Sequence, residues 1–115
     1  MRWVASAVVR LVLLGHVAAA QAAEWRFCYG TEPASRTFYL TVPFTTSSGM
    51  TAVETTFRQR LAADGLAVAQ VGCPLGADRR DLDGRIAIAV HHERENGMRI
   101  VSLDWPSGDP IAAVR

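Results

Sequence analysis

The sequence contains no lysine, so arginine carries all of its basic side-chain charge. Twelve arginines stand against eleven acidic residues, and the formal net charge is +1. A chain so close to neutrality creates no strong field that would attract nucleic acid or an anionic membrane. We therefore expect neither as a partner. Arginine as the sole basic residue, together with abundant alanine, is typical of GC-rich coding and hints at a bacterial source.

Long hydrophobic runs are also missing. The apolar stretch Leu11–Ala20 is shorter than the roughly 20 residues that span a bilayer. It follows Arg2 and Arg10 and ends in Ala20-Gln21-Ala22, the small-x-small pattern that signal peptidase cleaves. We predict a cleaved signal peptide over residues 1–22, with cuts after Ala20 or Ala23 as alternatives. An uncleaved anchor or a core helix is the competing interpretation. The mature protein is expected to be periplasmic or secreted, with no membrane span after cleavage.

Cysteine is scarce, with only Cys28 and Cys73 in the chain. In an oxidising compartment an even count usually means a disulfide. This disulfide would close a loop of about 45 residues and stabilise the fold by roughly 4 kcal/mol in the chain-entropy model. The rival interpretation is a reactive thiol. A domain this small buries only about 60–65% of its unfolded surface, so such a crosslink would matter.

Residues 37–44 give the clearest strand pattern. Phe38, Leu40, Val42 and Phe44 alternate with polar residues and should form one buried face. Pro43 cannot donate to a ladder, so this strand should lie at an edge or fray there. Shorter strands are predicted at 25–29, 66–73 and 98–105.

A helix is predicted over residues 52–64. Thr51 and Glu54 match a capping box, and Asp64-Gly65 supplies a C-terminal stop. Residues 78–95 fit either a helix or the first strand of a hairpin. As a helix they carry Leu82 and Ile86 on one stripe. As a hairpin they would turn at Asn96-Gly97, which serves equally as a helix stop.

These elements predict an α+β fold with two layers and one disulfide. The sheet would be mostly antiparallel, with about four strands and one or two helices on one face. We expect one domain over residues 23–105, followed by a loosely ordered tail at 106–115.

Catalytic motifs are lacking: no Gly-x-Ser-x-Gly elbow and no phosphate-cradling glycine loop occurs in the sequence. His91 and Glu95 would share a helix face, but two ligands are too few for a zinc site. The segment Asp81-Leu82-Asp83-Gly84 is only a fragment of a calcium loop. We predict no catalytic residue, no metal site and no cofactor.

Tyr39 and Thr41 are the predicted ligand-binding residues. They point away from the apolar face of the 37–44 strand, because successive strand residues face opposite sides. An exposed tyrosine between threonines would offer a sugar ring or an extended peptide an aromatic plate flanked by hydroxyls.

Residues 38–66 resemble the first half of a SPOR repeat. The stretch Phe38–Ser48 is similar to that family's Tyr-x-Val-x-Val-Gly-x-Phe strand and Ser-rich loop, with Pro43 in place of the usual glycine. The helix ending in Leu61-Ala62-Ala63-Asp64-Gly65 is similar to the family's Leu-x-x-x-Gly stop. The resemblance implies an envelope domain that binds peptidoglycan glycan strands through its sheet face.

The expected function is that of an exported, non-enzymatic binding domain, with an envelope glycan as candidate ligand. A small secreted inhibitor or protein-partner module, using the Thr45–Gly49 loop, is the first alternative. A small hydrolase that uses His91 or His92 is the second.

Overall fold

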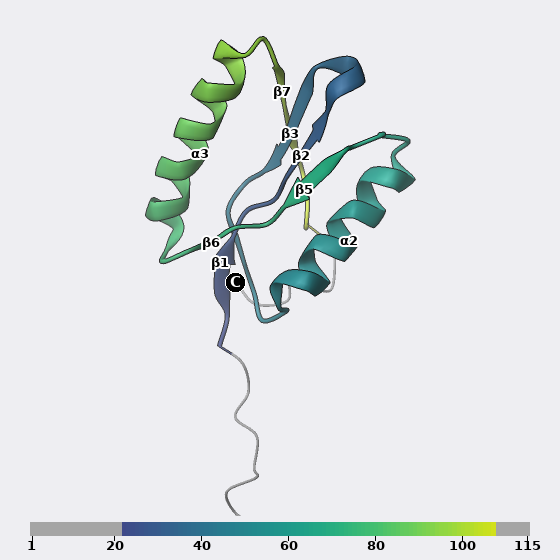
Figure 1. The fold of residues 1–115 in the computed structure, drawn as a ribbon. Helices are drawn as coiled ribbons and strands as arrows, with labels where there is room; N and C mark the ends of the chain where they lie inside the picture. The colour runs from purple at the N-terminus through teal and green to yellow at the C-terminus, as the bar shows by residue number, and fades with distance from the viewer. Residues whose placement is uncertain (1–21, 108–115) are drawn as a thin grey trace, which may run out of the picture.

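The computed structural model describes residues 22–107. The expected signal peptide and tail lie outside these residues, apart from their innermost positions. Within these residues seven short strands form two sheets, and two long helices flank them (Figure 1). The strands are β1 (Glu24–Arg26), β2 (Tyr29–Glu32), β3 (Thr37–Thr41), β4 (Phe44–Thr46), β5 (Gln70–Gly72), β6 (Leu75–Gly76) and β7 (Arg99–Leu103). The helices are η1 (Pro33–Ser35), α2 (Met50–Ala63) and α3 (Arg79–Glu95).

The strands pair in the orders β4-β1-β6 and β5-β2-β3-β7, and only β3 and β7 run parallel. Strand β5 pairs with β2, and β6 pairs with β1. The register is the same in both pairs, because Gly72 lies opposite Tyr29 and Gly76 lies opposite Trp25. That register places Cys28 directly opposite Cys73, and the two form a disulfide. The predicted α+β class, the mostly antiparallel sheet and the Cys28–Cys73 bond are therefore confirmed.

A β-bulge interrupts the long hairpin between its two halves. Arg26 pairs with Phe44 and Tyr29 with Leu40, so two residues, Val42 and Pro43, face a single residue on the partner strand. Proline has no N–H for the ladder, and a bulge accommodates it. The backbone hydrogen bonds that join β2 and β3 accordingly end at Thr41, whose amide donates to the Cys28 carbonyl at 2.9 Å.

The bulge changes which side chains face which way. Phe38 and Leu40 are buried on one face, whereas Phe44 lies on the other face, in the core beside α2. Val42, at the bulge itself, is 57% exposed. The prediction that these four residues share one buried face is therefore wrong, because the extra residue reverses the alternation beyond it.

Helix α2 packs on the face that carries the disulfide. Val53, Phe57 and Leu61 recur along one side of the helix, are fully buried, and share a core cluster with both cysteines. Trp105 completes this cluster, with its ring 4.9 Å from that of Phe57. Burying side chains of this size contributes roughly 1.5–3 kcal/mol each.

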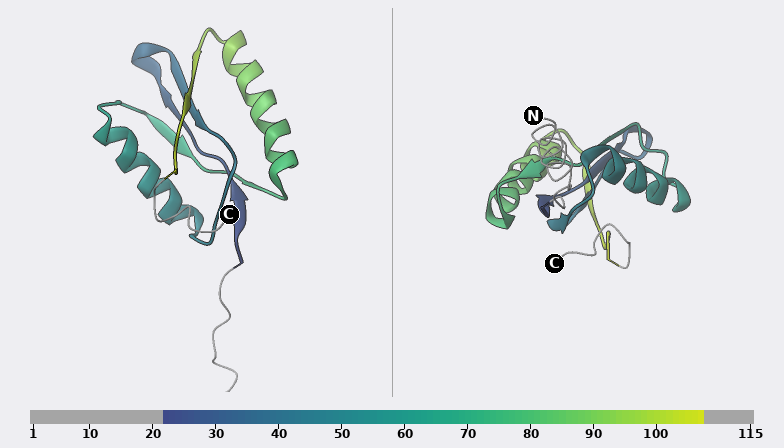
Figure 2. Two further views of the ribbon diagram at one scale, coloured as in Figure 1. Left: turned by 180° about the vertical axis from the view of Figure 1, so that it is seen from behind. Right: turned by 90° about the horizontal axis from the view of Figure 1, so that it is seen from below.

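Helix α3 covers the opposite face (Figure 2). Its one fully buried residue, Leu82, lies so close to Gly76 that a Cβ there would stand 2.5 Å from the leucine side chain. A Cβ on Gly30 would instead meet Leu61 of α2. Gly30 and Gly76 face opposite sides of the sheet, so the two helices do as well. The arrangement is α2, sheet, α3, and it differs from the expected placement of the helices on one face.

Both helices end in a Schellman motif with glycine in the left-handed region. In α2 the Leu66 amide donates to the Leu61 carbonyl, with Gly65 at φ 77°. In α3 the Met98 amide donates to the Glu93 carbonyl, with Gly97 at φ 77°. Asn96-Gly97 is thus a helix stop, and the helical alternative for residues 78–95 is the one observed.

Two local predictions at the ends of elements are wrong. Gly49 is the N-cap of α2, and no side chain caps it. Glu54 does not close a capping box, because its carboxylate accepts instead from the Cys73 amide at 3.1 Å. The strand expected over residues 66–73 is limited to β5, and the chain before it forms a loop.

No helix within residues 22–107 is long and apolar enough to cross a membrane.

Candidate binding site

A hollow of about 260 Å³ opens beside the bulge, where β7 has ended and the chain passes β4. Its apolar lining comes from the bulge, from β1 and from the segment after β7: Trp25, Val42, Pro43, Phe44, Trp105 and Pro106. Arg79 and Asp104 supply its charged groups. Ligand pockets usually measure about 300–1,000 Å³, so this hollow suits one ring or one side chain rather than a large molecule.

A second hollow of about 230 Å³ continues on the other side of the bulge, between α3 and β3. Leu40, Ile86 and Ser102 line it, and it shares Val42, Pro43 and Arg79 with the first. We call the two hollows together the bulge groove. Arg79, the first residue of α3, lines both hollows, so a ligand in either one has this arginine in its lining.

Among the charged side chains of the groove, Arg79 and Asp83 form an ion pair, and Asp104 forms none among the described residues. Arg79 forms an ion pair with Asp83 at 3.8 Å, and their side chains are 62% and 58% exposed. Exposed pairs of this kind contribute about 0–1 kcal/mol. Asp104 is exposed and has no hydrogen bond or ion pair to any residue between 22 and 107. The first hollow therefore holds an acidic group without a partner in the described chain.

The two tryptophans of the first hollow have different roles. Trp105 is 2% exposed and packs edge-on against Phe44, with ring centres 5.7 Å apart. Its indole N–H is buried and finds no acceptor within the described part of the chain. Trp25 is half-buried, so part of its ring remains accessible. Trp105 thus forms a fixed wall of the hollow, and Trp25 is the more accessible of the two tryptophans.

Of the two sequence-predicted site residues, Tyr39 lines neither hollow, and Thr41 lines the second hollow although it is almost fully buried. Tyr39 is 6% exposed and Thr41 is 1% exposed, because the sheet is covered on both faces. Tyr39 donates to the Glu32 carboxylate at 3.1 Å, and the Thr41 hydroxyl accepts from the Cys28 amide at 2.9 Å. The expectation that these two residues form an exposed plate is wrong.

Glu32 is the centre of the polar cluster around Tyr39. The Ser35 hydroxyl, the Ala67 amide and the Tyr39 hydroxyl all donate to its carboxylate. These hydrogen bonds, with Ser35 as the largest cause, hold the pKa of Glu32 below its usual 4.5. Burial raises the pKa of Tyr39 above 10, and the bond to Glu32 adds to this shift. The cluster ties β2, β3 and the 66–69 loop together, so its role is structural.

His91 and His92, the histidines within residues 22–107, lie on α3 and outside the groove. His91 pairs with Glu95 at 3.0 Å, and both side chains are largely exposed. His92 lies 3.1 Å from the Asn96 side chain. Neither histidine lines either hollow. Within residues 22–107 no group of three or more histidine, cysteine, aspartate or glutamate side chains could hold a metal ion.

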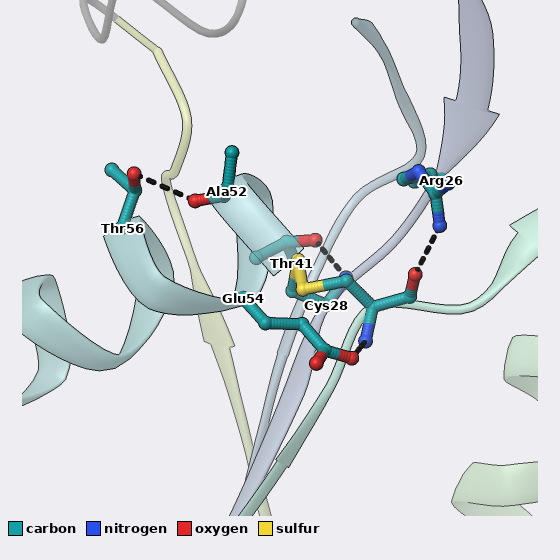
Figure 3. Close-up of a disulfide and its surroundings, with 7 residues drawn as sticks. Arg26, Cys28, Thr41, Ala52, Glu54 and Thr56 are labelled. Carbon is teal, nitrogen blue, oxygen red and sulfur yellow. Dashed lines mark hydrogen bonds between the residues drawn. A yellow bond between two sulfur atoms is a disulfide. The ribbon is translucent and has the colours of Figure 1, made fainter. Parts of the chain in front are cut away.

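The disulfide is held from both sides by polar groups (Figure 3). Arg26 is 6% exposed, and its guanidinium donates to the Cys73 carbonyl at 2.9 Å. Glu54 accepts from the Cys73 amide. Cys28 and Cys73 are 0% and 1% exposed. The two cysteines are therefore part of the core and do not form an accessible redox site.

Sequence reasoning missed the groove because its walls come from separate parts of the chain. Pro43 gave a signal that the strand is disturbed, but nothing local to Trp25 or Asp104 indicated that they meet beside it. No protein-family model, curated protein or solved structure matches this chain. The groove must therefore be interpreted from its own chemistry.

Proposed function

We propose that this chain is an exported binding domain without a catalytic role, and that it holds one sugar ring of a cell-envelope glycan in the first hollow of the bulge groove. Export rests on the signal-like residues 1–22, and the Cys28–Cys73 disulfide agrees with an oxidising compartment. The intact mass of the protein recovered from periplasm or medium tests it. A full-length mass in the cytosol would contradict it.

The accessible combination of an aromatic face and polar side chains carries the binding proposal. Sugar rings have an apolar face that stacks on indole and hydroxyls that bond to planar polar groups. The first hollow offers Trp25 for stacking, with Asp104 as acceptor and Arg79 as donor. Its volume of about 260 Å³ fits one ring. Of the described residues that line it, none is a histidine or a free thiol that could act as base or nucleophile.

The experiment is retention on purified peptidoglycan, measured together with thermal stability. Trp25→Ala should reduce retention by removing the stacking face. Val42→Arg should also reduce it, because a bulky side chain at this exposed position crowds the groove without entering the core. Ile88→Ala is the matched control, since Ile88 is an exposed apolar residue, 73% accessible, outside both hollows.

The two variants guard against a folding artefact. If Trp25→Ala melts at a much lower temperature, Val42→Arg alone decides the question. Failure of the wild type to bind any peptidoglycan preparation, including one whose amino sugars have been de-N-acetylated, would refute the proposal. Equal loss in Ile88→Ala would show that retention reflects general hydrophobic adsorption.

A further inference from the structure

We infer that the sugar held in the first hollow carries a free ammonium group, as glucosamine does, and that the Asp104 carboxylate is its counter-ion. This inference rests on the proposed function and names the ligand class of the same site. It begins from the charges that line the groove.

One cationic and two anionic side chains line the bulge groove: Arg79, Asp83 and Asp104. Arg79 and Asp83 form an ion pair with each other, so they largely cancel. No ion pair joins Arg79 to Asp104 among the described residues, so the Asp104 carboxylate is left unbalanced in the first hollow. A positively charged ligand group complements this site, and a negatively charged one would meet net repulsion.

The aromatic lining favours the same charge. The face of an indole ring is electron-rich and attracts ammonium groups, most strongly where water is excluded. Trp25 lines the same hollow as Asp104. An ammonium that bonds to Asp104 gains a charge-assisted hydrogen bond, which is stronger than a neutral one.

A ring fits the remaining lining better than an extended basic side chain. Pro43 and Pro106 add apolar rings to the lining of the hollow, and Ser107 lines it as well. Arg79 also lines this hollow, and its guanidinium can donate to ring hydroxyls. An amino sugar satisfies the stacking face, the acceptor and the donor together, whereas a lysine side chain would use only the acceptor and the aromatic face.

The test is calorimetric titration at mildly acidic pH with two oligosaccharides of equal length and linkage, one of glucosamine and one of N-acetylglucosamine. Acetylation removes the ammonium charge and leaves the ring unchanged. The wild type should bind the glucosamine oligomer about tenfold more tightly. Asp104→Asn, which keeps the shape of the side chain, should abolish this preference. Arg79→Gln should weaken binding of the N-acetylglucosamine oligomer by removing a donor, and should widen the preference for the glucosamine oligomer because it leaves the Asp83 carboxylate without its cation.

The outcomes separate the inference from the proposed function. If both oligomers bind equally and Asp104→Asn changes nothing, the ammonium is not recognised, while glycan binding stands. If neither binds and peptidoglycan is not retained, both ideas fall. If a lysine oligomer of the same length binds as tightly as the glucosamine oligomer and depends equally on Asp104, the site takes peptide cations and the sugar assignment is overturned.

Discussion

Removal of the Cys28–Cys73 disulfide should lower the free energy of unfolding by about 4 kcal/mol. The crosslink joins residues 45 positions apart in the sequence. With a loop of that length, the chain-entropy relation gives about 4 kcal/mol at 25 °C. Both cysteines are also buried beside α2, so their replacement by alanine leaves a small void that adds to the loss.

The assay is urea unfolding of the double variant Cys28→Ala/Cys73→Ala, compared with the wild type. The double variant avoids an unpaired thiol and any exchange reaction. For a small domain the unfolding slope is about 1 kcal/mol/M, so the midpoint should fall by several molar. Because small domains have only about 5–15 kcal/mol in total, the variant should be close to unfolding at 37 °C.

Two results would refute this reasoning. A loss below about 1 kcal/mol would mean that the core keeps the strands paired without the bond. Two free thiols per native molecule, trapped by alkylation during extraction, would mean that the bond is not formed in the cell.

The remaining predictions concern buried and polar side chains. Tyr39→Phe should cost only about 0.5–1.5 kcal/mol, the value of the lost hydrogen bond to Glu32, whereas Tyr39→Ala should cost about 3–5 kcal/mol; a nearly unchanged melting point for Tyr39→Ala would contradict the burial described above. Leu82→Ala should cost about 2–5 kcal/mol in chemical unfolding, and a loss below 1 kcal/mol would mean that α3 is not packed on the sheet. Glu32 stabilises the fold above its unfolded pKa near 4.5, and this stability is lost as the pH falls through its lower folded pKa. The melting point of Glu32→Gln should accordingly lie below that of the wild type at neutral pH and converge with it in acid; a constant gap would show that the charge of Glu32 is irrelevant.

The elements that depend on local chemistry could be predicted from the sequence. The stripe of Val53, Phe57 and Leu61 forms the buried side of α2, and Asp64-Gly65 ends that helix. The pairing of Cys28 with Cys73 followed from the count of cysteines and the expected compartment. The helix depends on residues that are close in sequence, and two cysteines allow only one intramolecular disulfide.

The faces of the long hairpin could not be predicted in the same way. Strict alternation assigns Phe38 and Phe44 to one side, and only the register against the neighbouring strand reveals the bulge between them. A covered face and an exposed face also look alike in sequence when threonines line them. Thr37 and Thr41 are both buried, and the hydroxyl of Thr41 accepts from the Cys28 amide. The groove is formed beside the same bulge, so the alternation of residues along one strand could not predict it.

The central claim is that the hollow beside the bulge binds an envelope glycan, and the indole N–H resonances of the protein test it most directly. After removal of residues 1–22 only Trp25 and Trp105 remain, so the two signals can be assigned with one variant. Titration with soluble, de-N-acetylated peptidoglycan fragments should shift the Trp25 indole and the Asp104 amide saturably, and leave the amides of Ile88 and His91 unmoved. Saturable shifts confined to the outer side of α3, or no shift at Trp25 at a concentration where the fragments bind, would contradict the account.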